Sequence, residues 1–241
     1  MKYLSSLLFV LVATGMPVAH AAKDIDNLGA LGQANFRLLS QDLGAALSYK
    51  ALATGEPLGV TGFAIGLSLT GTDLQHPEAW QGATTSADAP DTLLVPKLQV
   101  SKGLPAGFDI GAFITSVPDT NIQLLGGELG YAIIDGSMAL PSLSVRGTFS
   151  RLSGVDQLDL NTTGVELSIS KGLAVFTPYA GVGRIWTDSE PATSTGLTSE
   201  SLQQNKYFLG ANINFMLFNL SLEIDETDAV TSYNSMVGVR F

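Results

Sequence analysis

The sequence predicts an all-β protein, an antiparallel transmembrane β-barrel of about twelve strands, with ten strands as the smaller alternative. Three observations predict it: an amino-terminal export signal, apolar residues that recur with a period of two, and a last segment that ends in an aromatic residue. The 241 residues are 45% hydrophobic and only 14% charged, and the mean hydropathy is +0.27. Because about 25% of residues are charged in ordinary soluble domains, part of this surface is expected to face an apolar solvent.

The composition also excludes several classes of function. The chain has 12 Lys and Arg against 22 Asp and Glu, a formal net charge of -10, whereas a binder of duplex nucleic acid needs a basic face. It has no cysteine, which removes disulfides, thiolate zinc sites and cysteine nucleophiles together. We therefore expect no nucleic-acid partner and no cofactor.

The first residues have the pattern of an export signal. Lys2 precedes a short apolar run from Leu4 to Val12, and Ala19-His20-Ala21 has the small-x-small pattern of a signal-peptidase site. The apolar run is too short for a membrane anchor. We predict a signal peptide over residues 1–21, a single barrel domain over residues 22–241, and a location in the bacterial outer membrane.

Bulky apolar and small polar residues alternate along the rest of the chain. In segment 205–217, Tyr207 and Leu209 share one face, and Gly210 and Asn212 share the other. A soluble β-sandwich also alternates, but the small polar face here has too little bulk for a packed core, so we expect lipid on the apolar side. Eleven segments are long enough for tilted membrane strands of about 9–11 residues: 43–53, 60–72, 93–102, 107–117, 121–134, 141–151, 161–171, 175–187, 205–217, 219–227 and 231–241.

An odd number of strands is unusual, because single-chain bacterial barrels have even numbers. Segment 28–41 is therefore expected to supply the missing element, with Asn35 to Ser40 as a short first strand. The alternative is a helix in the lumen, since Phe36, Leu39 and Leu43 have helical spacing.

The carboxyl-terminal segment carries a resemblance to known proteins. Tyr233, Val237, Val239 and Phe241 share one face of it, and it resembles the targeting strand that the barrel-assembly machinery reads in bacterial outer-membrane barrels. The stretch from Thr177 to Gly183 resembles a strand of small OmpA-like and OmpW-like barrels. Over most of the mature chain, stretches 42–49, 57–59 and 152–158 resemble an uncharacterised family of proteobacterial outer-membrane proteins. That resemblance implies the fold, the assembly machinery as a partner, and no particular activity.

A periplasmic carboxyl terminus, which the resemblance implies, fixes the direction of every strand. The short turns 54–59, 102–106, 135–140, 171–174 and 217–219 then lie inside, and the longer connections 73–92, 118–120, 152–160, 188–204 and 226–230 lie outside. Short periplasmic turns with longer outer loops are typical of outer-membrane barrels.

With the polar faces inward, ten ionisable residues become candidates for lining the lumen: Lys50, Lys97, Asp109, Glu128, Arg146, Glu166, Arg184, Glu223, Asp225 and Arg240. Five acids balance five bases. Charges in a lumen of low dielectric constant have to pair to offset their desolvation, so a mostly closed interior is expected. The alternative is a narrow channel with opposite charges on opposite walls.

The outer connections are acidic and contain no Lys or Arg. Outer-membrane lipids and lipopolysaccharide are the expected partners, with divalent cations bridging to the acidic loops; an acidic vestibule for cationic solutes is the alternative. Trp80, Trp186, Tyr207 and Tyr233 are predicted to form an aromatic girdle, with sugar stacking as an alternative role for Trp80. The acids are Asp73, Glu78, Asp88, Asp91, Asp119, Asp156, Asp159, Asp188, Glu190, Glu200, Glu226 and Asp228.

The function predicted from these patterns is a passive narrow channel for small solutes or a structural protein of the envelope, with no catalytic residue and no metal site. An enzyme is the first alternative. It would be a lipid A or phospholipid acyl hydrolase or transferase that uses His76, the one histidine after the signal. A surface adhesin or receptor that uses loops 73–92 and 188–204 is the second alternative.

Overall fold

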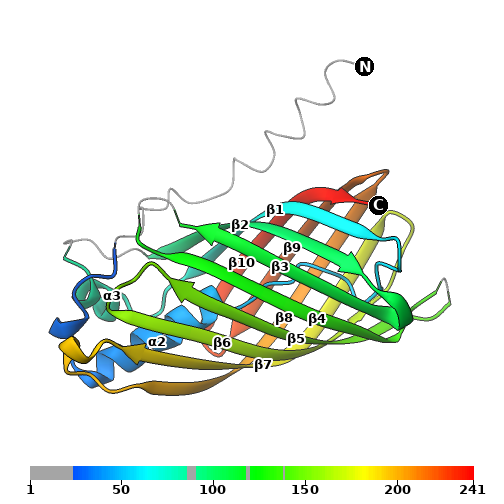
Figure 1. Ribbon diagram of the computed structural model, residues 1–241. Coiled ribbons are helices and arrows are strands. Elements are labelled where there is room, and N and C mark those ends of the chain that lie inside the picture. Colours follow the sequence, from blue (N-terminus) through cyan, green and yellow to red (C-terminus); the bar gives the residue numbers. More distant parts are fainter. Residues whose placement is uncertain (1–23, 86–90, 118–119, 138) are drawn as a thin grey trace, which may run out of the picture.

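The computed structural model describes residues 24–85, 91–117, 120–137 and 139–241, and its strands form one closed antiparallel barrel of ten (Figure 1). Each strand pairs with its neighbours in sequence, and β1 (Phe63–Asp73) closes the barrel against β10 (Val230–Arg240). The others are β2 (Thr92–Gly103), β3 (Phe108–Ser116), β4 (Gln123–Ile134), β5 (Ser142–Ser153), β6 (Leu158–Ser170), β7 (Phe176–Pro191), β8 (Glu200–Phe215) and β9 (Phe218–Thr227). Closure leaves no unpaired sheet edge, and the predicted signal peptide lies outside the described residues.

The smaller of the two predicted strand numbers is the observed one, because segments 28–41 and 43–53 are not strands. A short 3-10 turn, η1 (Leu28–Ala30), is followed by helix α2 (Gln33–Leu47), so the helical alternative for this region is confirmed. The fifteen residues of α2 include no β-branched residue, which favours a helix over a strand. The side chains of Phe36, Leu39 and Leu43 are fully buried.

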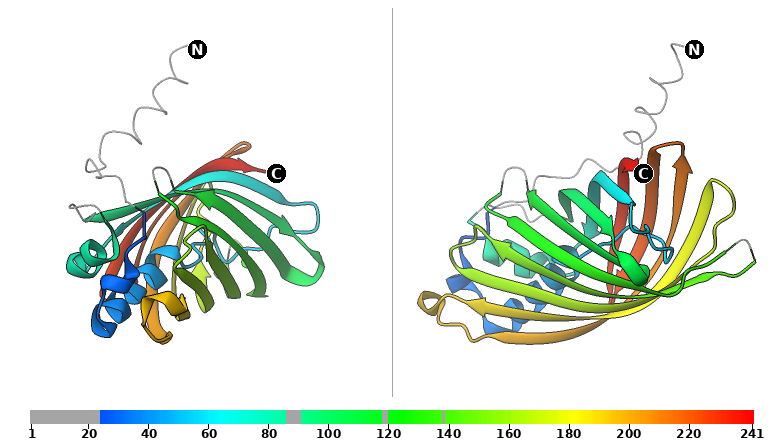
Figure 2. Two further views of the ribbon diagram at one scale, coloured as in Figure 1. Left: turned by 60° about the vertical axis from the view of Figure 1, so that its left-hand side comes forward. Right: turned by 45° about the vertical axis from the view of Figure 1, so that its right-hand side comes forward.

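After α2 the chain runs through the barrel interior without regular structure until β1 begins. Lys50 reaches Asp225 near α2, and further along the backbone N–H of Leu58 donates to Asp109 at the opposite end of the lumen. We call residues 33–62 the plug segment. In Figure 2, α2 lies at one end of the barrel and the last residues of the plug segment leave the strands at the opposite end, where Val60 is exposed.

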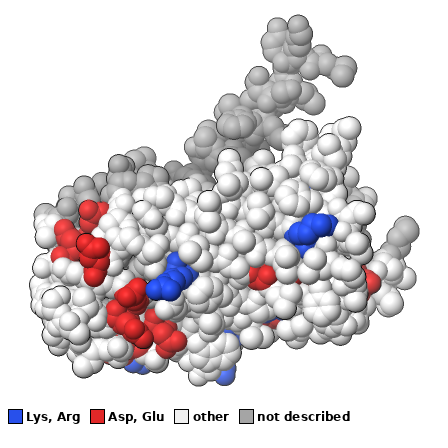
Figure 3. All heavy atoms as spheres, viewed as in Figure 1, with Lys and Arg blue, Asp and Glu red and all other residues white. Residues whose placement is uncertain are grey.

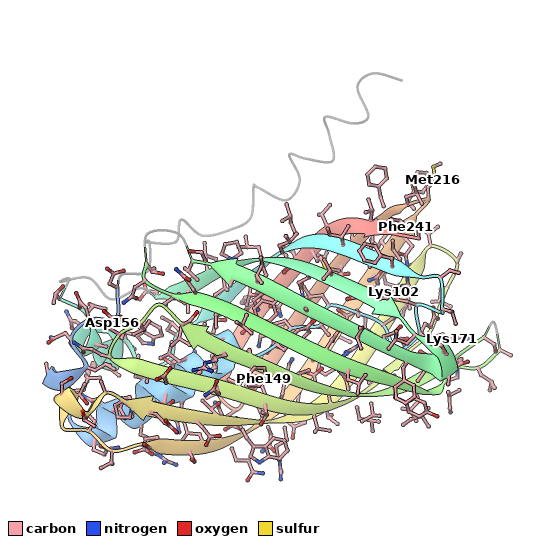
Figure 4. All side chains as sticks on the ribbon, viewed as in Figure 1. Lys102, Phe149, Asp156, Lys171, Met216 and Phe241 are labelled. Carbon is pink, nitrogen blue, oxygen red and sulfur yellow. The ribbon has the colours of Figure 1, made fainter. Side chains whose placement is uncertain are left out.

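The two ends of the barrel differ as the sequence predicts. At one end the strands are joined by short connections, including η2 (Pro105–Gly107) and the two residues between β8 and β9. The opposite end carries α2, α3 (Pro77–Ala83) and η3 (Thr193–Thr195). We call these the inner end and the outer end. In Figure 4, Lys171, Met216 and Phe241 mark the inner end and Asp156 marks the outer end.

Large apolar side chains cover the exterior of the strands. Leu67 is 69% exposed and Leu209 is 61% exposed, and exposed bulky residues of this kind occur on every strand. Soluble proteins rarely leave such wide apolar surface uncovered, whereas a lipid-facing barrel requires it. Among the described residues, no helix is long and apolar enough to cross a membrane.

Candidate functional site

An apolar cluster fills the outer half of the lumen. Phe36, Leu39 and Leu43 of α2 pack with Trp80 of α3 and with the ends of the surrounding strands, and all four side chains are fully buried. Burying one large apolar side chain contributes roughly 1.5–3 kcal/mol. The helix is therefore held in the barrel by the same burial that forms the core of a soluble domain.

The carboxylate of Asp42 connects the two helices of this cluster. It is fully buried, and it accepts hydrogen bonds from the backbone N–H groups of Gln75 (3.1 Å) and His76 (3.0 Å) and from Trp80 Nε1 (3.1 Å). His76 Nδ1 lies 2.8 Å from its other oxygen. Because a buried carboxylate needs this many donors, Asp42 fixes α3 over α2. No pattern in the sequence indicates this contact, because Asp42 and His76 are 34 residues apart in the chain.

A buried ion pair joins the plug segment, just after the end of α2, to strand β9 of the barrel wall. Lys50 Nζ lies 2.7 Å from Asp225 Oδ1, and neither side chain is exposed. Asn234 donates from Nδ2 to the other oxygen of Asp225 at 2.7 Å, and Gln99 donates from Nε2 to the carbonyl of Lys50 at 2.9 Å. The position of the plug segment is thus set by charge as well as by apolar packing.

Further charges pair from strand to strand across the inner wall. Lys206 Nζ lies 2.6 Å from Glu166 Oε1, and Arg146 Nε lies 2.8 Å from Glu128 Oε2. Arg146 also approaches Glu166 at 3.7 Å. Such pairs offset the desolvation of the charges that take part in them.

Lys97 differs from these residues. Its side chain is buried, its Nζ has no hydrogen-bond partner among the described residues, and it lies 4.9 Å from the centre of the Phe113 ring. A cation over an aromatic face is stabilised by the ring quadrupole. Lys97 is therefore the one lumen ammonium in the described part that makes neither a hydrogen bond nor an ion pair.

The structure brings nine of the ten predicted lumen residues to the inside; Arg184 is the exception. Its side chain is exposed on the exterior and donates from Nε (3.2 Å) and Nη2 (3.0 Å) to Asn205 Oδ1. The prediction for Arg184 was wrong because β7 has bulky apolar residues on both faces, with Tyr179 and Ile185 inside. The residues found inside are Lys50, Lys97, Asp109, Glu128, Arg146, Glu166, Glu223, Asp225 and Arg240.

Sequence reasoning also missed Lys206 and misplaced Trp80. Tyr207 was assigned to the apolar exterior of its strand, and the alternation then puts Lys206 inside, where it is buried. Trp80 is not a girdle residue, because it lies in the core with no exposed surface, which also excludes sugar stacking. Trp186, Tyr207 and Tyr233 do lie on the exterior.

The inner half of the lumen is polar and partly open. It holds a cavity of about 60 Å³, enough for a few water molecules. Arg240 and Asp109 lie at its periplasmic side in the predicted orientation, and Arg146 lies deeper. The other polar residues that line it are Thr54, Glu56, Gln99, Ser101, Glu128, Asn212 and Asn219.

Acidic residues gather at the outer end, as Figure 3 shows. Several of them have partners: Glu200 lies 2.6 Å from Arg37 and accepts a hydrogen bond from Gln33, and Asp188 accepts one from Ser201. Gln33 and Arg37 hold the pKa of the Glu200 carboxyl below its usual range. Among the described residues, no three His, Cys, Asp or Glu are placed to hold a metal ion. Asp88 and Asp119 lie outside the described residues, and divalent cations as partners stay a prediction.

Closed antiparallel strands, an apolar exterior and a polar inner wall define the class of the molecule: a transmembrane β-barrel, with its lumen occupied by its own chain.

No family model matches the chain, and no curated protein matches it. Several solved structures are similar. A KdgM porin is 10% identical with a TM-score of 0.39, over 74% of this chain and 99% of that one. The translocator domain of the autotransporter NalP from Neisseria meningitidis is 9% identical with a TM-score of 0.43, over 76% and 88%. The β-domain of the Bordetella autotransporter BrkA is 10% identical with a TM-score of 0.41, over 75% and 100%. Likenesses this distant assign no function.

Proposed function

We propose that this protein is an integral outer-membrane β-barrel that is closed at rest and serves the envelope as a structural protein. The observation that carries this proposal is the occupied lumen: the buried face of α2 fills the outer half, and the Lys50–Asp225 pair anchors the chain beneath it. In the part of the chain that the structure describes, these contacts occupy the space through which a solute would have to pass.

The apolar exterior supports the membrane location. Strands of this kind cross bacterial outer membranes as closed barrels, and the export signal predicted over residues 1–21 would deliver the chain to the periplasm. The face formed by Tyr233, Val237, Val239 and Phe241 stays the predicted assembly signal.

A channel for small polar solutes is the second candidate, and the inner wall favours it. Hydroxyl groups pair in rows along β5 and β6, as in Ser144–Ser168 (2.8 Å) and Ser150–Thr162 (2.6 Å). If the plug segment moved out, this wall would line a hydrophilic pore. In this reading the segment is the gate, and conduction requires a signal that displaces it.

Single-channel recording in planar bilayers tests both candidates. We expect the full chain to give no conductance steps, and a variant without residues 33–50 to give stable steps, because the deletion removes α2 and Lys50. A heat-modifiable band on gels would show that each protein has inserted as a folded barrel. Steady open conductance of the full chain would contradict the closed-barrel proposal, and voltage-induced opening would favour the gated channel.

We expect a structural role for His76, since its ring nitrogen Nδ1 and its backbone N–H both contact Asp42, which joins α3 to α2. An Asp–His contact of this kind also orients the histidine of catalytic triads, so the expectation needs a test in cells. Cells that carry His76→Ala should keep unchanged phospholipid and lipid A profiles. An altered acyl pattern would instead support the hydrolase or transferase alternative. Unchanged cell and phage attachment after deletion of the outer loops 73–92 and 188–204 would remove the adhesin alternative.

A further inference from the structure

The outer part of the exterior wall carries two arginines on strands separated by one. We propose that Arg151 of β5 and Arg184 of β7 bind the headgroup of an outer-leaflet glycolipid that carries two phosphates. The inference deepens the proposed function, because it rests on the outer-membrane location of the barrel.

Both arginines lie at the outer edge of the apolar belt. On these two strands the exterior residues are apolar up to Phe149 on β5 and Val182 on β7, and the next exterior residue toward the outer end is Arg151 or Arg184. Figure 4 shows Phe149 on the wall between the two ends. The same change occurs from Val165 to Thr163 on β6. Because the strands of a barrel are tilted, residues at one depth in the membrane are displaced along successive strands. Arg151, Thr163 and Arg184 are displaced in this way. They therefore lie at one depth, where lipid headgroups meet water.

The two arginines are unusual among the cations of the chain. Ten of its 12 Lys and Arg lie in the described part, which lacks Lys2 and Lys23. Arg37 on α2 pairs with Glu200, and Lys102 and Lys171 lie at the inner end. The remaining five face the lumen: Lys50, Lys97, Arg146, Lys206 and Arg240. Within the described residues, Arg151 and Arg184 are therefore the two cations on the outer part of the lipid-facing wall.

The register between the strands gives the spacing of the pair. Arg151 lies opposite Asn161 of β6, and Arg184 lies opposite Val165, four residues further along the same strand. Two strand spacings and four residue rises place the two Cα atoms about 16 Å apart. One phosphate cannot bridge that distance with both side chains extended outward, whereas a disaccharide headgroup with a phosphate at each end fits it. Trp186 lies on the same exterior face, one exterior position beyond Arg184, where its ring can stack on a sugar.

The present partners of the arginines leave them available. Arg151 lies 3.7 Å from Asp159, but the side chains are 56% and 67% exposed, and such surface pairs contribute little. Arg184 is held by the neutral amide oxygen of Asn205. Arginine binds phosphate through two parallel charge-assisted hydrogen bonds, which are roughly twice as strong as neutral ones. A lipid phosphate can therefore replace Asp159 and supplement Asn205.

Binding of a diphosphorylated lipid A to the purified full-length barrel tests the inference. The affinity in detergent is measured for the wild type, for Arg151→Gln/Arg184→Gln, and for the control Lys102→Gln/Lys171→Gln, which removes the same charge at the inner end. We expect the arginine double variant to lose about a hundredfold in affinity, since each of its two lost charge-assisted contacts contributes roughly tenfold. The control variant and the wild type should bind alike, and the fully dephosphorylated lipid should bind weakly to all three.

Three results would overturn the inference: equal affinity of the arginine double variant and the wild type, equal binding of the dephosphorylated lipid by the wild type, or equally tight binding of inorganic phosphate alone. The last result would show a free-anion site. A heat-modifiable band for all variants separates these outcomes from failure of the barrel proposal, because that band reports folding into a barrel independently of lipid.

Discussion

The outer and inner halves of the lumen are closed in different ways. In the outer half, α2 and α3 form an apolar core with the strand ends, and Trp80 and Phe36 have no exposed surface. In the inner half, the same segment is extended, its neighbours are polar, and a small cavity lies beside Arg240. The proposed barrier to solutes therefore lies in the apolar packing at the outer end. The polar inner half mainly positions the plug segment.

The largest effect is expected from breaking the Lys50–Asp225 ion pair, which lies at the boundary of the two halves. Asp225→Asn leaves Lys50 buried without a counter-ion, and breaking a buried pair from one side costs about 3–5 kcal/mol. We expect the plug segment to leave its place, which protease cleavage within residues 48–62 would report. The double variant Lys50→Met/Asp225→Asn is the control, and it should restore most of the protection. Equal protection of the single variant and the wild type would argue against this anchor.

Truncation within the outer core is expected to have the next largest effect. Leu43→Ala removes buried methyl groups from a packed site, which costs about 2–5 kcal/mol. Hydrogen exchange of the α2 amides should accelerate accordingly. The matched change in the inner half, Ser101→Ala beside the cavity, should alter exchange by less than about 0.5 kcal/mol. Equal effects in the two halves would refute the contrast between them.

Asp42→Asn tests the connection between the two helices. The amide keeps the size of the side chain but offers one acceptor oxygen in place of the carboxylate, so some of the donors from Gln75, His76 and Trp80 lose their partner. The expected cost is about 1–3 kcal/mol. Fluorescence of the tryptophans should report greater solvent access to Trp80, with Trp186→Phe as the background to remove the second indole. An unchanged spectrum would show that α3 is held by apolar contacts alone.

The smallest effect concerns pH. In the folded state, Gln33 and Arg37 lower the pKa of Glu200. Their contact with Glu200 therefore stabilises the plug segment at pH values above the ordinary carboxyl pKa. This contribution is lost as the pH falls through the lowered value. Because Arg37 is about half exposed, the effect should not exceed about 1 kcal/mol. Unfolding of the wild type should therefore depend more on acidic pH than unfolding of Glu200→Gln; identical pH dependence would contradict it.

The strands were predictable because lipid and lumen impose opposite demands on alternate residues. Segment 205–217 follows this rule, so its exterior face could be assigned from Tyr207 and Leu209 alone. Where both faces are apolar the rule fails, as for Arg184 on β7. It also fails for residues that belong to neither wall: α2 packs inside the barrel, and the partnership of Asp42 with His76 forms only when two distant segments meet at the outer end. Contacts of that kind have no periodic signal in the sequence.

The direction of residues 48–62 has a consequence for assembly. The chain enters the barrel at the outer end and leaves it at the inner end, where β1 begins beside Phe241. We therefore expect the seam between β1 and β10 to close around this part of the plug segment during assembly. In the predicted orientation, a polypeptide fused upstream of Ile25 would then be carried across the bilayer and displayed to the cell's surroundings.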